Sequence, residues 1–129
     1  LLSITDKKIL IVRGGEGRQV LQEILEARGA HVTFADVYQR TLPRISSDLF
    51  RDVFQNPTGS LAICTSEALI KNLCDLAKKA QVKIEGLQLC VISPKMADYA
   101  KSLGFMKPAI VAKSALDEDI LWTIRTRLK

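Results

Sequence analysis

The chain has 129 residues, which is enough for one compact domain and too few for two of ordinary size. Hydrophobic residues make up 47% of it and charged residues 26%. This composition excludes an intrinsically disordered chain, because enough apolar surface is available to offset chain entropy. The apolar runs are far shorter than the ~20 residues that cross a bilayer, so we expect no membrane association.

The charge balance indicates an anionic partner. There are 19 Lys and Arg residues against 14 Asp and Glu, a formal net charge of +5. Nucleic acid fits poorly, because the basic residues are scattered and aromatic residues that could stack on bases are few, with one Trp, two Tyr and four Phe. Polycarboxylate and phosphate ligands stay open, as does a solvated surface without a ligand.

The cysteines and the single histidine exclude several kinds of site. Cys64, Cys74 and Cys90 form an odd set without CxxC spacing, which favours a reducing, cytoplasmic compartment and argues against a bound metal. Cys64 and Cys90 lie in apolar runs and are predicted to be buried. His31 alone cannot build a typical zinc site or a histidine-based catalytic triad.

The first third of the chain predicts a strand, a helix and a second strand. Lys8–Val12 is a short apolar run, and a glycine-rich turn follows it. Helical spacing of Val20, Leu21, Ile24 and Leu25 predicts a helix over Arg18–Arg28 that ends at Gly29. His31–Tyr38 alternates as a strand does.

A proline-containing break then separates two parts of the chain. Residues 40–46 are predicted to be a linker of the interdomain type, because Pro43 disfavours regular structure there. Residues 1–39 form a strand–helix–strand segment before it, and residues 47–129 form an alternating segment after it. That second segment starts with a short helix carrying Leu49, Phe50, Val53 and Phe54.

The remainder repeats the alternation of strand and helix. Strands are predicted at Ser60–Cys64, Leu87–Ile92 and Lys107–Ala112, and helices at Ser66–Ala80 and Pro94–Leu103. Ser114 is expected to cap the last helix, and Asp117, three residues later, occupies the position of the acidic partner in a capping box. The buried stripe of that helix is expected to be Leu116, Ile120, Leu121, Ile124 and Leu128.

Five strands alternating with five helices predict an α/β fold. We expect a flavodoxin-like, three-layer arrangement in which a mostly parallel five-stranded sheet carries helices on both faces. The two segments together form one such unit. Ligands of these folds bind outside the carboxyl ends of the strands, so the loops at that edge are the candidate site.

The loop after the first strand reads RGGEGR. Gly14, Gly15 and Gly17 allow a ligand to approach the backbone, and the following helix offers free N–H groups. Arg13 and Arg18 flank the glycines and are suited to grip carboxylates. The loop lacks the GK[ST] of a phosphate-binding P-loop. A tight turn with solvated arginines is the alternative.

Hydroxyl groups follow the other strands. Thr65 and Ser66 open one predicted helix, and Ser93 with Lys95 opens the next. Each serine is a helix cap, a ligand contact, or both. Tyr38 closes the second strand, either as a packing residue or as a proton donor to a leaving group.

The order of these motifs resembles the second half of the uroporphyrinogen-III synthase family. The family pattern is an apolar strand, RG-x-x-GR, an amphipathic helix, RGA-x-V and VYxR before a proline-bearing linker. The matching residues are Arg13-Gly14, Gly17-Arg18, Arg28-Gly29-Ala30, Val32, Val37-Tyr38-Gln39-Arg40, Thr65-Ser66, Ile92-Ser93-Pro94 and Leu103-Gly104.

The resemblance implies a cyclising hydro-lyase of tetrapyrrole and haem biosynthesis. Such an enzyme converts the linear tetrapyrrole hydroxymethylbilane to uroporphyrinogen III, with inversion of the last pyrrole ring and loss of water. It uses no metal or organic cofactor. Its substrate carries carboxylates on every pyrrole, which fits a basic protein.

The resemblance also implies roles for individual residues. Arg13, Gly14, Gly17 and Arg18 would line the substrate cleft, and Thr65 and Ser66 would form its hydroxyl-bearing loop. Tyr38 matches the tyrosine suggested to protonate the departing hydroxyl. Ser93 and Lys95 occupy the last loop, where many members have a threonine pair. Lys95-Met96 stands there in this chain, so a substrate contact is expected in place of a catalytic hydroxyl.

Length is the main departure from the family, whose members have two flavodoxin-like domains. The chain starts at Leu1 without a Met, and we expect it to be the C-terminal half of a synthase and inactive by itself. Its two segments either fold together or are exchanged between two copies in a segment-swapped homodimer. The alternative function is a non-catalytic regulatory module that binds an anion or phosphate.

Overall fold

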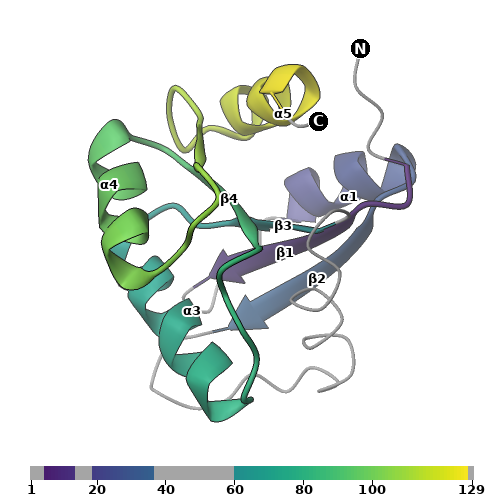
Figure 1. Cartoon of the computed structure of the whole chain (residues 1–129). Coiled ribbons are helices and arrows are strands. Elements are labelled where there is room, and N and C mark those ends of the chain that lie inside the picture. Colours follow the sequence, from purple (N-terminus) through teal and green to yellow (C-terminus); the bar gives the residue numbers. More distant parts are fainter. Residues whose placement is uncertain (1–4, 14–18, 37–59, 128–129) are drawn as a thin grey trace.

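The computed structural model describes residues 5–13, 19–36 and 60–127. They form one sheet of five parallel strands with helices on both faces (Figure 1). The strands are β1 (Lys8–Arg13), β2 (His31–Asp36), β3 (Ser60–Ile63), β4 (Gln88–Val91) and β5 (Ile110–Val111). The helices are α1 (Gln19–Ala27), α3 (Glu67–Lys79), α4 (Pro94–Leu103) and α5 (Asp117–Arg127). The expected α/β fold with a parallel five-stranded sheet is confirmed.

Alternation along the strands divides the interior into two apolar clusters. Leu10 and Val12 of β1 face α3 and α4, whereas Ile9 and Ile11 face α1 and α5. Figure 1 shows these helix pairs on opposite sides of the sheet. All four residues of β3 and of β4 are buried, as expected for central strands that are covered on both faces.

The strand order determines which loops become neighbours. The order is β2-β1-β3-β4-β5, so the chain moves outward from β1 to β2 and then returns to the other side of β1. β2 is added on one side of β1, and β3, β4 and β5 are added on the other side, so the order of strand addition reverses between β1 and β3. These two strands pair in parallel from Lys8↔Ser60 to Ile11↔Ile63. Because every pairing is parallel, all carboxyl ends lie at one edge of the sheet.

Two glycines end helices as the sequence predicts. Gly29 after α1 has φ +91°, and Gly104 after α4 has φ +110°. Both angles lie in the left-handed region that only glycine adopts easily. At Gly29 a side chain would also press against Thr5, since a Cβ placed there would lie 3.1 Å from the Thr5 methyl carbon. The chain therefore turns sharply into β2 and β5.

The start of the last helix differs from expectation. Leu116, predicted to be buried, is 59% exposed, because α5 begins one residue later and Leu116 lies before its first turn. Ser114 donates a hydrogen bond to the Asp119 carboxylate and accepts one from the Leu116 N–H. Asp119 is therefore a partner of the Ser114 hydroxyl that the sequence did not predict, and the pairing with Asp117 stays a prediction.

Some predicted elements are shorter or lie outside the described residues. The strand predicted over Lys107–Ala112 is reduced to Ile110–Val111. The predicted linker at 40–46 and the helix carrying Phe50 fall outside the described residues. Segment exchange between two copies stays a prediction. Within the described ranges, β1 pairs with β3 of the same chain.

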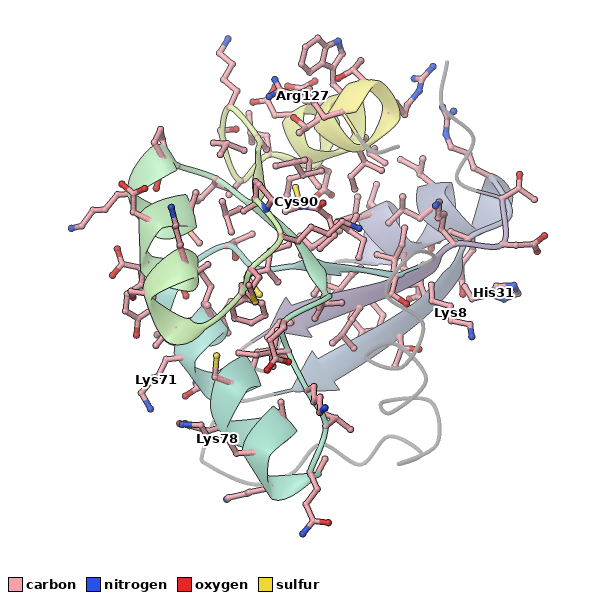
Figure 2. The ribbon with its side chains drawn as sticks, viewed as in Figure 1. Lys8, His31, Lys71, Lys78, Cys90 and Arg127 are labelled. Atoms are coloured by element: carbon pink, nitrogen blue, oxygen red, sulfur yellow. The ribbon has the colours of Figure 1, made fainter. Side chains whose placement is uncertain are left out.

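All three cysteines are buried, which confirms the prediction for Cys64 and Cys90. Cys64 and Cys90 are almost fully buried, and Cys74 is 4% exposed on α3. Figure 2 shows Cys90 in the interior, whereas Lys71 and Lys78 point outward from α3. Burial disfavours the thiolate and raises the pKa of all three thiols, that of Cys90 to about 12.

The raised pKa of Cys90 predicts a loss of stability in alkali. The unfolded thiol ionises near pH 9, whereas the folded thiol ionises near pH 12. Its contribution is complete below pH 9 and disappears as the pH rises to about 12, by at most about 1.4 kcal/mol per pH unit. Urea unfolding between pH 8 and pH 10.5 measures this decline. It should be shallower in a Cys90→Ala variant, and identical slopes would contradict the assignment.

Candidate functional site

The candidate site lies at the carboxyl edge of the sheet, where three neighbouring strands deliver polar residues. Arg13 is the last residue of β1, Thr65 and Ser66 connect β3 to α3, and Ser93 connects β4 to α4. The register pairs Ile11 with Ile63 and Ile63 with Cys90. Arg13 lies two residues after Ile11, and Thr65 lies two residues after Ile63. The backbones of Arg13 and Thr65 therefore reach this edge of the sheet side by side.

Ser66 and Ser93 each cap a helix. The Ser66 hydroxyl accepts a hydrogen bond from the Leu69 N–H at 3.1 Å, and the Ser93 hydroxyl accepts one from the Met96 N–H at 3.2 Å. Both serines have extended backbones, the usual conformation of an N-cap. A serine that accepts in this way retains its own O–H as a donor. Capping and ligand binding by these hydroxyls are therefore compatible.

The two capped helices present a positive end to the same edge. N–H groups of the first turn have no partner within an α-helix, and the helix dipole adds a partial positive charge. Pro94 occupies the first turn of α4 and removes one donor there. The helix starting at Glu67 therefore offers more backbone donors than its neighbour, where Lys95 supplies an ammonium group instead.

An ion pair joins the two helix starts. The Lys95 ammonium lies 4.0 Å from a carboxylate oxygen of Glu67, with the lysine side chain 87% exposed. Sequence reasoning missed Glu67. The available signal was that Glu67 and Lys95 are the first and the second residue after the caps of successive parallel strand–helix units. An exposed ion pair at this distance contributes at most about 1 kcal/mol, so Lys95 is free to exchange Glu67 for a ligand carboxylate.

The structure brings together only part of the predicted site. Thr65, Ser66, Ser93 and Lys95 lie on two adjacent turns, and Thr65 is partly buried. Arg13 is the last residue of the neighbouring strand β1, and only its backbone belongs to the described part of the structure. The remaining predicted residues are also outside the described ranges, namely Gly14, Gly15, Gly17, Arg18 and Tyr38.

Two other features are absent from the described residues. Within 5–13, 19–36 and 60–127, no cluster of three or more His, Cys, Asp and Glu residues is arranged to hold a metal ion. None of the helices in these ranges is long and apolar enough to span a membrane.

The fold and this edge define a class of protein. It is a parallel three-layer α/β protein whose strand-end site combines helix N-termini, hydroxyls and an ammonium group, a set that suits carboxylate or phosphate groups. The family model described as "Uroporphyrinogen-III synthase HemD" matches residues 1–121. The chain belongs to the uroporphyrinogen-III synthase family, as its motifs indicate.

Two curated relatives agree with this membership. The chain is 30% identical over 107 residues to the uroporphyrinogen-III synthase of Escherichia coli (strain K12), covering 81% of this chain and 44% of that protein. The Salmonella typhimurium (strain LT2) synthase matches with the same identity and coverage. The chain spans about half the length of these curated relatives. The solved Thermus thermophilus uroporphyrinogen III synthase matches 97% of this chain and 52% of its own, at 14% identity and a TM-score of 0.44.

The capping role of Ser66 predicts a measurable loss of stability. Ser66→Ala should lower the free energy of unfolding by about 1 kcal/mol, because the Leu69 N–H loses its acceptor. Ser66→Asp should retain most of the stability, because aspartate caps equally well. Urea denaturation monitored by circular dichroism gives both values.

The matched control is Ser102→Ala on the last turn of α4. Ser102 is exposed and donates to the Tyr99 carbonyl at 2.6 Å without capping a helix start. Its replacement should change stability by less than half as much. Equal effects at both serines would contradict a special role for the Ser66 cap.

Proposed function

We propose that this chain forms the C-terminal half of a uroporphyrinogen-III synthase. The complete enzyme would convert hydroxymethylbilane to uroporphyrinogen III, inverting the last pyrrole ring and releasing water. The family match over residues 1–121 carries this proposal. The strand-end site supports it, because Ser66, Ser93 and Lys95 form a set of groups suited to the substrate's carboxylates.

Binding at this edge would consist mainly of carboxylate recognition. First-turn N–H groups of α3 and the Lys95 ammonium would hold carboxylates of neighbouring pyrroles, each charge-assisted hydrogen bond contributing about 1.5–3 kcal/mol. The Ser66 and Ser93 O–H groups would donate to the same carboxylates. The net charge of +5 favours the approach of a polyanion.

Positioning is the main catalytic contribution in this proposal. Holding the linear chain folded brings the attacking carbon of the last pyrrole ring close to the terminal hydroxymethyl carbon, which reduces the entropic part of the barrier. The carbon–oxygen bond of the hydroxymethyl group breaks, and the hydroxyl takes up a proton and leaves as water. The last pyrrole ring attacks the resulting electrophilic carbon through its substituted ring carbon and gives a spiro intermediate. One carbon–carbon bond to that ring then breaks and re-forms at its other side, and loss of a proton from the ring completes the inverted macrocycle. These steps involve no change of redox state, and we propose that they need no metal or organic cofactor.

Residues whose side chains are not among the described ones complete the proposed cleft. Tyr38 would donate the proton that turns the departing hydroxyl into water. The arginines Arg13 and Arg18 would bind further carboxylates across the glycine loop formed by Gly14, Gly15 and Gly17. The enzyme would work in the reducing cytoplasm, consistent with three free buried thiols.

The proposal predicts how activity depends on the rest of the synthase. A complete synthase carrying this chain as its C-terminal half should convert hydroxymethylbilane to the III isomer of uroporphyrinogen. The product is measured by oxidising it and separating the isomers. The 129-residue chain alone should show no conversion above the spontaneous background, because one side of the cleft is missing. Robust conversion by the chain alone would refute the division into halves. No conversion by either protein would refute the function and favour the non-catalytic module.

The role of Tyr38 is tested with two variants of the complete synthase. Tyr38→Phe removes only the hydroxyl and should slow turnover by 10²–10⁴-fold, the range of general acid catalysis. Tyr99→Phe removes a hydroxyl from α4 away from the carboxyl edge and should leave turnover unchanged. An unchanged rate in Tyr38→Phe would remove this residue from the mechanism.

A further inference from the structure

The proposed anion-binding edge contains an acidic side chain of its own. Glu67 is the first residue of α3 and directly follows the Ser66 cap. The partial positive charge of the helix N-terminus stabilises this carboxylate, but the carboxylate also adds a negative charge where a ligand carboxylate would bind. The first turn of α4 reads Pro-Lys-Met-Ala and contains no acid. Glu67 is therefore the first-turn acid that a bound polycarboxylate would meet at the two capped helices.

The same carboxylate is the partner of Lys95. A carboxylate oxygen of Glu67 lies 4.0 Å from the Lys95 ammonium nitrogen. The two side chains differ in freedom, since that of Glu67 is 39% exposed and that of Lys95 is 87% exposed. The lysine can therefore move between Glu67 and a ligand, whereas the glutamate stays close to the start of α3. Without a ligand, the ammonium group is held by the chemical group that the proposed substrate would present to it.

An internal ion pair of this kind lowers the affinity for any carboxylate that has to replace it. The affinity falls in proportion to the fraction of molecules in which the binding group is available. An exposed pair is weak and separates readily, so the affinity falls by a small factor and the ligand is still admitted. The proposed reaction releases only water, so its substrate and product carry the same carboxylates, and the binding of both is weakened alike.

We propose that Glu67 is a positioning residue that sets the affinity for the tetrapyrrole carboxylates by competing for Lys95, an inference that rests on the proposed function. In the empty site Glu67 holds the ammonium group between the two helix starts. A substrate carboxylate displaces Glu67 from the lysine, and Glu67 takes the ammonium group back as the product leaves. Glu67 does not touch the reacting atoms, so its effect is on binding and release.

The competition is tested with Glu67→Gln in the complete synthase. The amide keeps the size of the side chain and removes its charge, so KM for hydroxymethylbilane should fall about two- to sixfold. The inhibition constant of added uroporphyrinogen III should fall by the same factor. We expect kcat to stay within about twofold, because the gain in binding is equal in the ground and transition states.

The matched control is Asp75→Asn on the same helix. It makes the same change of net charge and breaks another exposed ion pair, in which Asp75 lies 3.0 Å from the Lys71 ammonium nitrogen. Asp75 lies about 12 Å further along α3 than Glu67, and Lys71 points outward from that helix (Figure 2). KM should therefore not change in Asp75→Asn.

The dependence on Lys95 is tested by a double-mutant cycle. Lys95→Met alone should raise KM, because a charge-assisted contact with the substrate is lost. Adding Glu67→Gln to Lys95→Met should leave KM at the raised value, because no ammonium group remains to compete for. Thermal unfolding verifies that each variant folds, and Glu67→Ala removes the same carboxylate if the glutamine variant is unstable.

The alternative outcomes separate this inference from the proposed function. An unchanged KM in Glu67→Gln, an equal fall in Asp75→Asn, or an equal fall with and without Lys95 overturns the competition and leaves the proposed function intact. An inactive wild-type synthase overturns the proposed function itself.

Discussion

The parallel pairing of β1 with β3 is the constraint on which the rest of the structure depends. It joins the first segment of the chain to the last, across residues 37–59. The order in which strands are added to the sheet also reverses at this pair, so that α1 lies on one face of the sheet and α3 on the other. Without this ladder the carboxyl ends of β1 and β3 would not be adjacent, and the polar groups at Arg13 and Ser66 would belong to different surfaces.

The site follows from that adjacency by simple local rules. A strand that is soon followed by a serine capping the next helix places a hydroxyl and a positive helix end at the edge of the sheet. Two successive units of this kind give Ser66 and Ser93, and their first turns are close enough for Glu67 to meet Lys95. In the proposed site, anion affinity would therefore come mainly from the backbone, to which the lysine would add an adjustable charge.

Much of this arrangement could be predicted from the sequence, because it depends on local signals. The serine caps, the proline at the start of α4 and the glycine after it fixed the limits of that helix. Leu116 could not be placed correctly, since its spacing continues the apolar stripe of α5 although the helix begins after it. Glu67 was missed because its importance depends on a neighbour 28 positions away, which only the order of the strands brings near.

Amide hydrogen exchange in the complete synthase tests the central claim most directly, namely that the tetrapyrrole binds at the carboxyl edge of β3 and β4. Exchange is followed by mass spectrometry with and without uroporphyrinogen III. Slower exchange is expected in peptides covering residues 65–70 and 93–98, where the first turns of α3 and α4 lie. Protection confined to the opposite edge, in residues 80–87 and 104–109, would contradict it.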